Sequence, residues 1–184
     1  MAQARAAERS DGVAVDMNRR LSLTGLCFFS ITFIALGGAQ EDFEAARAAY
    51  EHSSHDEQAR LIYVTKLAEI ASPLVAEYRQ SGHRNDKLMG EINSELQKHP
   101  APRDIDSAKL KRLLVGKWES PRRTYVFRAD GKWGNEEGPI SDNWRISGNE
   151  LVEGSSRGTI ILLNSDYFIY SEKGSVFFHS RVKE

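Results

Sequence analysis

Between positions 40 and 98, apolar residues recur every three or four positions, which is the spacing of helices that bury one face. They form two neighbouring stripes: Leu61, Val64, Ala68, Ala71 and Val75, and beside them Tyr63, Leu67, Ile70 and Leu74. An apolar face this wide is typical of a helix that packs against another surface. The pattern therefore predicts a buried helical segment over residues 40–98.

Several residues indicate where these helices begin and end. The stretch Ser54–Glu57 has the spacing of a capping box, so a second helix should begin there. Pro73 lacks an amide donor and crowds the preceding turn, which predicts a kink or a split near Ala71. Gly82 should end this helix, and Asn85 can cap a third one.

The pattern changes after residue 98. Two prolines and several polar residues over 99–112 predict a linker that carries one short helix. From 113 to 184, apolar and polar residues alternate in short runs separated by turn signals such as Asp130-Gly131 and Gly148-Asn149. Seven or eight such strands in succession predict an antiparallel up-and-down sheet, and closure into a barrel would remove its exposed edges.

Three late runs are apolar on both faces: residues 160–163 (IILL), 167–170 (YFIY) and 176–178 (VFF). Strands of this kind are usually covered on both sides. The helical segment is the nearest candidate for the outer cover, and contact between two copies of the chain is the alternative. The expected fold class is therefore α+β, with an N-terminal helical segment followed by a small antiparallel up-and-down β-barrel.

Residues 1–39 have the order of a secretory signal: a basic pair, an apolar run and then small residues. We expect translation to start at Met17 and cleavage to follow Ala39, which predicts an exported protein, periplasmic or secreted. The alternative is an uncleaved anchor in the inner membrane formed by residues 21–39, because their length is close to that needed to cross a bilayer.

Charge and cysteine content narrow the classes of function. The formal net charge is -1 over 184 residues, whereas nucleic-acid-binding proteins usually carry a concentrated basic excess. The one cysteine, Cys27, lies inside the apolar run that we expect to be removed. The mature chain would then lack cysteine, which excludes disulfides and thiol catalysis.

Three short motifs stand along the predicted barrel. Gly116-Lys117-Trp118 opens the first strand, Ser165-Asp166-Tyr167 lies near a late turn, and Arg181 ends the last strand. Together they resemble the signature of lipocalins and of shorter bacterial lipocalin-like domains. The resemblance covers about residues 113–183 and implies a barrel fold. The chain between the motifs is shorter than in full lipocalins, which argues against a roomy ligand cavity.

The signature residues also have a physical interpretation of their own. Gly116 allows the chain to pass tightly, so that Trp118 can close the floor of the barrel. Arg181 can lie over the indole face, a cation–π contact worth about 0.5–2 kcal/mol. These are stability roles, and a fold by itself does not specify a function.

The barrel interior contains the candidate ligand site. An eight-stranded barrel is just wide enough for its own side chains or for one small ligand, and short strands favour a packed core. Any remaining cavity would have an aromatic rim and suit a small hydrophobic or amphipathic molecule. The candidate ligand-binding residues are Tyr125, Phe127, Trp133, Trp144, Tyr167 and Phe178.

Residues with catalytic or metal-binding potential are scattered. His52, His55 and Asp56 have a spacing that can hold a metal, but zinc sites usually need three or four protein ligands and no other stands at a recognisable spacing. Glu136 and Glu137 lie in a loop with glycine and proline, where nothing apolar would raise a pKa for acid catalysis. We therefore expect no enzymatic activity, no metal and no cofactor.

The sequence thus predicts an exported, non-enzymatic binding protein whose candidate ligand is a small hydrophobic molecule. The alternative is a structural or protein-interaction module with a filled barrel, whose helices bind a protein partner or a second copy of the chain. Nucleic acid is not an expected partner. Contact with a membrane is expected only through an uncleaved signal segment.

Overall fold

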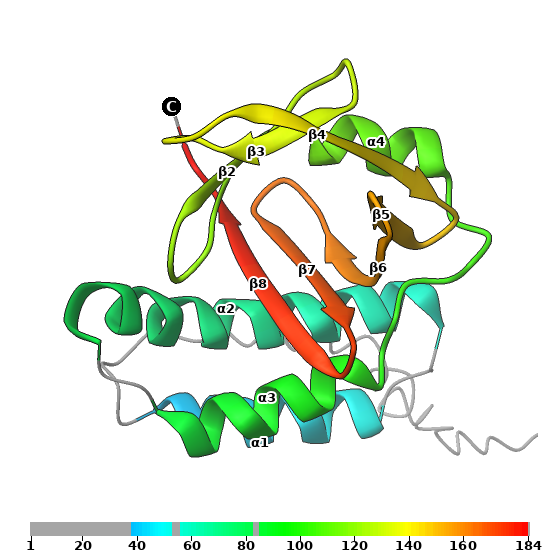
Figure 1. Cartoon of the computed structure of the whole chain (residues 1–184). Coiled ribbons are helices and arrows are strands. Elements are labelled where there is room, and N and C mark those ends of the chain that lie inside the picture. The colour runs from blue at the N-terminus through cyan, green and yellow to red at the C-terminus, as the bar shows by residue number, and fades with distance from the viewer. Residues whose placement is uncertain (1–37, 53–55, 83–84, 184) are drawn as a thin grey trace, which may run out of the picture. The chain divides into compact units, whose positions relative to one another are not determined.

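The computed structural model describes residues 38–52, 56–82 and 85–183 (Figure 1). Within these residues the helices are α1 (Ala39–Glu51), α2 (Glu57–Ser81), α3 (Asp86–Gln97) and α4 (Ser107–Leu114). The strands are β1 (Gly116–Glu119), β2 (Thr124–Phe127), β3 (Lys132–Asn135), β4 (Ile140–Ser147), β5 (Glu150–Glu153), β6 (Ser156–Leu163), β7 (Tyr167–Glu172) and β8 (Ser175–Arg181). The predicted α+β class is confirmed. The expected signal segment before Gly38 lies outside the described residues.

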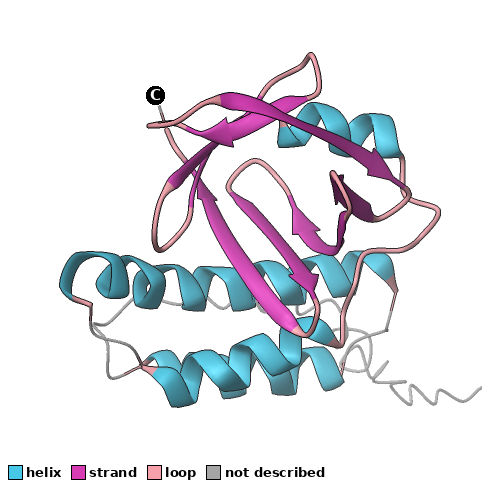
Figure 2. Ribbon diagram, in the orientation of Figure 1, coloured by secondary structure: helices cyan, strands magenta, loops and turns pink. Residues whose placement is uncertain are grey.

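The strands form a closed antiparallel barrel in which each strand pairs with the next and β8 returns to β1 (Figure 2). The hairpins turn where the sequence predicts, because Gly131 and Gly148 adopt positive φ angles of 83° and 59°. Lys173 (φ 49°) and Gly174 (φ 79°) form the tight turn between β7 and β8. Local turn chemistry therefore accounts for the up-and-down order.

The helices α2 and α3 cover the outer face of the last three strands, α1 packs against α2, and Figure 1 shows α2 running across the strands. Ile161, Leu162, Ile169 and Phe178 of the barrel share one buried cluster with apolar residues of these helices. The expectation that the helical segment covers the strands that are apolar on both faces is thus confirmed. The helices and the barrel share this core.

Helix α2 differs from the prediction in one respect. It runs without a break from Glu57 to Ser81 with Pro73 inside it, so the predicted split near Ala71 is wrong. Pro73 lies on the exposed side of the helix, where water can satisfy the carbonyl that the missing amide leaves free. The end is as predicted, because Gly82 caps the helix with a left-handed φ of 72°.

The two helix starts can also be compared with the prediction. Asp56 caps α2 by accepting a hydrogen bond from the amide of Ala59 at 2.7 Å. Ser54, expected to cap it, lies outside the described residues. Asn85 caps α3 by accepting a hydrogen bond from the amide of Leu88 at 3.2 Å, as predicted.

One end of the barrel is closed by Trp118 and α4. The indole of Trp118 is fully buried, and its Nε1 donates a hydrogen bond to the carbonyl of Leu114 at 2.7 Å. The Arg181 guanidinium lies over the indole, with its Cζ 4.0 Å from the ring centroid, and donates to the carbonyls of Leu113 and Val115. Gly116 suits this position because its φ is 137°, which other residues rarely adopt, and because a Cβ atom there would displace the Arg181 guanidinium. The predicted floor and cation–π contact are confirmed.

Candidate ligand-binding site

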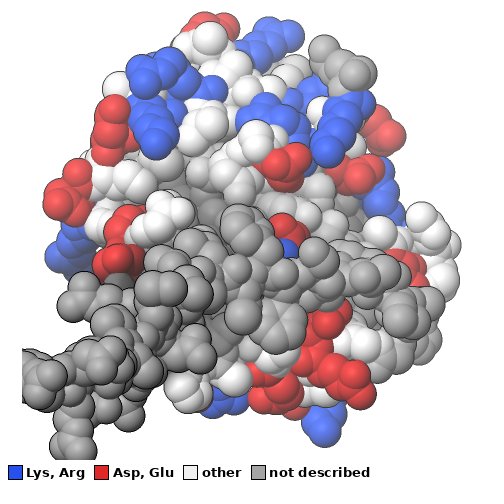
Figure 3. All heavy atoms as spheres, turned by 180° about the vertical axis from the view of Figure 1, so that it is seen from behind, with Lys and Arg blue, Asp and Glu red and all other residues white. Residues whose placement is uncertain are grey.

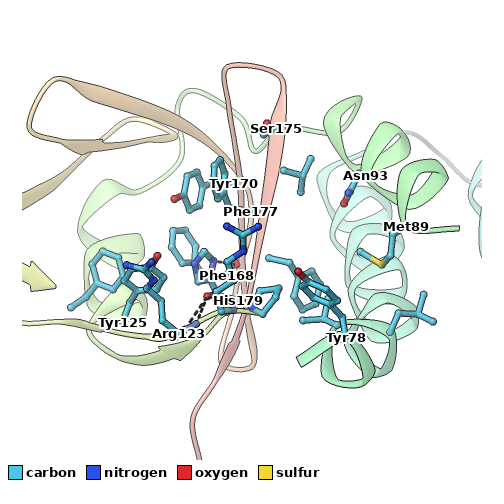
Figure 4. A pocket seen from close by; sticks show the side chains of 18 of the residues that line it. Tyr78, Met89, Asn93, Arg123, Tyr125, Phe168, Tyr170, Ser175, Phe177 and His179 are labelled. Atoms are coloured by element: carbon cyan, nitrogen blue, oxygen red, sulfur yellow. Dashed lines mark hydrogen bonds between the residues drawn. The ribbon is translucent and has the colours of Figure 1, made fainter. Parts of the chain in front are cut away.

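The other half of the barrel is not filled. A cavity of about 480 Å³ begins inside the barrel and continues around the edge of β8 to α2 and α3 (Figure 4). We call its barrel part the inner cavity, lined by Tyr125, Trp133, Glu153, Tyr170, Phe177 and His179. We call its helix-facing part the groove, lined by Tyr78, Met89, Asn93, Val176 and Phe178. The volume is sufficient for a small molecule.

The cavity exists because β1 is short. In the described structure β1 pairs with β8 through two residue pairs, Trp118 with Arg181 and Glu119 with Ser180. The chain then leaves β8 and forms the loop from Ser120 to Arg123 that borders the cavity. The part of β8 from Ser175 to His179 therefore has β7 on one side and the cavity on the other.

Stacked aromatic rings form one wall of the inner cavity. The Tyr170 ring centroid lies 5.1 Å from that of Phe168 and 4.9 Å from that of Phe177, with nearly parallel planes. Tyr170 can lie this close to β6 because Gly158 faces it, where any Cβ atom would collide with the ring. Figure 4 shows Tyr170 and Phe177 side by side. This wall offers apolar ring faces to a ligand.

His179 joins this wall as a neutral residue. It is 4% exposed, and burial lowers the pKa of its imidazole from 6.5 to about 4. Its Nδ1 lies 3.2 Å from the carbonyl oxygen of Phe168, which can accept only, so Nδ1 carries the proton. Nε2 is then an unprotonated acceptor at neutral pH.

Glu153 places a carboxyl group in this apolar surrounding. Burial and the nearby negative charges of Glu172 and Asp142 raise its pKa from 4.5 to about 7. Among the described residues no side chain or amide forms a hydrogen bond or ion pair with the Glu153 carboxyl. Glu153 is half-buried, and a carboxyl group that is partly removed from water without a partner is costly to ionise, so this position is chemically unusual.

Two further polar atoms of the inner cavity have no partner in the described structure. The Nε1 atom of Trp133 is buried and unpaired. The Tyr170 side chain is 9% exposed, and its hydroxyl forms no hydrogen bond there. Buried polar groups are normally hydrogen-bonded, so the buried and unpaired Trp133 Nε1 beside a cavity indicates that something else can bind there.

The residues that the sequence suggested for ligand binding lie in four different places. Tyr125, Phe127 and Trp133 line the cavity from the barrel side, and Phe178 lines the groove. Trp144 does not line it: the indole is 4% exposed and its Nε1 donates to the Lys132 carbonyl at 3.1 Å. Tyr167 lies on the outer face of β7, where its ring centroid is 5.8 Å from that of Phe178.

The remaining signature residue, Asp166, lies in the turn before β7, away from the cavity lining. Its carboxylate accepts a hydrogen bond from the Ser165 hydroxyl at 2.7 Å and lies 3.5 Å from Lys183 Nζ. These contacts are local to the end of the barrel. Asp166 therefore has a structural position here.

Sequence reasoning missed Glu153, Tyr170 and His179 as site residues. A signal was present for Glu153, because strand residues two apart face the same side and Leu151 faces the barrel interior. An acidic residue two positions after an inward-facing apolar residue of the same strand indicates a polar group inside the barrel. The same alternation places His179 beside Phe177 on the inner face of β8.

The other titratable residues considered from the sequence do not form a site. No group of three or more His, Cys, Asp or Glu side chains suited to a metal ion occurs among the described residues. Glu136 pairs with Lys117 at 2.9 Å in the turn between β3 and β4. His55 lies outside the described residues.

No protein-family model, curated protein or solved structure matches this chain. On the face shown in Figure 3, Lys and Arg side chains are mixed with Asp and Glu. No helix in the described part of the chain is long and apolar enough to cross a membrane.

Proposed function

We propose that this protein binds one small, largely apolar molecule in the inner cavity and catalyses no reaction on it. The observation that carries this proposal is the unfilled half of the barrel, which forms the inner part of the cavity of about 480 Å³, has a wall of stacked aromatic rings and contains the buried, unpaired Nε1 atom of Trp133. A cavity with apolar walls and a few polar groups is the usual form of a small-molecule site.

Binding is favoured over catalysis by the state of the polar groups. His179 is buried and its Nδ1 faces a backbone carbonyl, so no carboxylate orients it as a general base. Two serines line the cavity, Ser120 and Ser175, but neither is hydrogen-bonded to a histidine in the described structure, and the Ser120 hydroxyl donates to the Arg123 carbonyl. A non-enzymatic role is part of the proposal.

We further propose that the barrel is a lipocalin-like domain and that the protein is exported. The closed eight-stranded barrel and the contact between Trp118 and Arg181 support the first part. The order of residue types before Ala39 supports the second. A filled-barrel interaction module is the weaker candidate, because one half of the barrel is open.

The binding proposal can be tested with a panel of small apolar fluorescent probes and native mass spectrometry of the chain from Gln40 onward. We expect saturable binding of one molecule per chain. Phe177→Ala should weaken it at least fivefold, because the ring stacks on Tyr170 and is 39% exposed, so its removal disturbs the core little.

Ile62→Ala is the matched control, because Ile62 is an exposed apolar residue outside the cavity lining. It should leave probe affinity within about twofold of the parent, since a surface substitution away from a site usually has a small effect. Absence of saturable binding across the panel, or equal losses in both variants, would overturn the proposal.

A further inference from the structure

The position of Glu153 points to the charge of the ligand. Its side chain enters the barrel because Glu153 pairs with Trp144 across β4 and β5, and cross-strand partners share a face. The charges that act on it, from Glu172 on β7 and Asp142 on β4, are both negative. No basic side chain of the described residues compensates the carboxylate.

The cavity that Glu153 lines also contains aromatic rings, which are able to bind cations. Tyr170 and Phe177 stack with an angle of 12° between their planes, and Trp133 lies 5.7 Å from Tyr125 between ring centroids. The face of an aromatic ring carries negative charge density that attracts ammonium groups. The unpaired Tyr170 hydroxyl, on a side chain 9% exposed, adds an acceptor for an N–H donor.

The basic residues of the cavity lie elsewhere along it. Arg122 and Arg123 border it from the loop between β1 and β2, and both are exposed. Arg123 Nη1 lies 3.2 Å from the side-chain amide of Asn135. Neither arginine acts on the charge of Glu153. An anionic ligand would therefore be held near the loop and not in the aromatic part of the barrel.

We propose that the molecule bound in the inner cavity is an organic cation, an amine or quaternary ammonium group on an apolar body. The cationic group lies at Glu153, and the apolar body lies against Tyr170, Phe177 and Trp133. The inference rests on the proposed binding function and specifies the class of ligand. It requires no covalent step and no cofactor.

The proposal predicts how affinity depends on pH. The groups that face Glu153 are Glu172, Asp142 and Tyr170, and none of them supplies a positive charge. Because the pKa of Glu153 is raised to about 7, its carboxyl group is largely neutral at pH 5.5 and largely ionised at pH 8. Affinity for a permanent cation should therefore rise between these two values.

The test uses three molecules of the same shape and different charge: phenethylammonium, 2-phenylethanol and phenylacetate. Their dissociation constants for the chain from Gln40 onward are measured by NMR titration at pH 5.5 and pH 8. The amine stays protonated over this range, because alkylamines titrate near pH 10. At pH 8 we expect the ammonium compound to bind at least tenfold more tightly than the alcohol, and phenylacetate to bind most weakly.

Two variants test whether the preference for the amine over the alcohol comes from the Glu153 carboxyl group. Glu153→Gln keeps the shape of the side chain and should reduce the preference for the amine over the alcohol to less than twofold at both pH values. Glu150→Gln is the matched control, because Glu150 lies on the same strand and pairs with Arg157 at 3.0 Å on the exposed surface. It should retain the preference and its pH dependence.

The outcomes separate the two proposals. Equal affinities for amine and alcohol at pH 8, or an unchanged preference in Glu153→Gln, would overturn the cation inference while leaving a binding function in place. Stronger binding of phenylacetate than of the amine would overturn the cation inference and would indicate an anionic ligand held by Arg122 and Arg123. Failure of all three compounds and of the apolar probes to saturate the protein would overturn both proposals.

Discussion

The two halves of the barrel have similar aromatic linings, but the polar atoms of one half are hydrogen-bonded whereas those of the other half are not. In the closed half, below α4, the indole nitrogens of Trp118 and Trp144 both donate to backbone carbonyls. In the open half, the Trp133 nitrogen, the Tyr170 hydroxyl and the Glu153 carboxyl have no partner among the described residues. The closed half is therefore built for stability, whereas the open half keeps polar groups available at some cost in stability.

The largest expected difference between the halves concerns their tryptophans. Trp118→Ala should lower the free energy of unfolding by about 4 kcal/mol, because removing a fully packed large side chain leaves a void. Trp133→Ala should cost about 1–2 kcal/mol, because Trp133 already borders a cavity and is partly exposed. Urea denaturation followed by circular dichroism measures both. Equal losses would contradict the division into two halves.

The second prediction concerns the guanidinium over Trp118. Arg181→Met should lower the free energy of unfolding by about 2–3 kcal/mol, because two charge-assisted hydrogen bonds to the Leu113 and Val115 carbonyls are lost together with the cation–π contact. Arg181→Lys keeps the charge but cannot reach both carbonyls with the same geometry, so an intermediate loss is expected. The same denaturation experiment applies, and a loss below 0.5 kcal/mol in Arg181→Met would contradict this role.

The third prediction sharpens the comparison through pH. The folded-state pKa of Glu153 is raised to about 7, so the folded protein holds its proton more tightly than the unfolded chain does. The stability that this proton contributes is present below the unfolded pKa and is lost as pH rises through 7. Relative to the parent, Glu153→Gln should therefore gain about 2 kcal/mol in free energy of unfolding between pH 5 and pH 8.

Glu150→Gln serves as the control for this pH series, because its carboxylate pairs with Arg157 at the surface. Its free energy of unfolding should follow that of the parent at every pH. If the free energies of unfolding of Glu153→Gln and the parent changed in parallel with pH, the Glu153 carboxyl group would have the same pKa in the folded and unfolded chains. That result would contradict the raised pKa of Glu153, which is the main electrostatic difference between the open and the closed half.

The smallest effect is expected for Tyr170→Phe. The hydroxyl has no partner to lose, so the free energy of unfolding should change by less than about 0.5 kcal/mol or rise slightly. Affinity for phenethylammonium should nevertheless fall, since the hydroxyl is one of its proposed acceptors. A stability loss above 1 kcal/mol would indicate a structural role for this hydroxyl.

Much of the fold could be predicted from the sequence because its signals are local. Turn residues such as Asp130-Gly131, alternation in the early strands and apolar runs in the late ones sufficed for the barrel and its helical cover. Pro73 did not split α2, because it lies on the exposed side of the helix, and that position is not visible in a local pattern.

The cavity could not be predicted in the same way. Its existence depends on where β1 leaves β8, which is a question of register between segments distant in sequence. The unpaired state of Tyr170 and Glu153 is likewise a property of three-dimensional packing. Sequence gives the residue types that a pocket needs, whereas strand length and packing decide which of them face it, as the separate positions of Trp133 and Trp144 illustrate.

The short junction between β1 and β8 also has a consequence for folding. Its two residue pairs join the beginning and the end of the barrel sequence, and the entropy needed to bring distant segments together makes such contacts late to form. The cation–π contact between Arg181 and Trp118 forms at this same junction. The barrel and its cavity are therefore complete only after β8 has docked on β1.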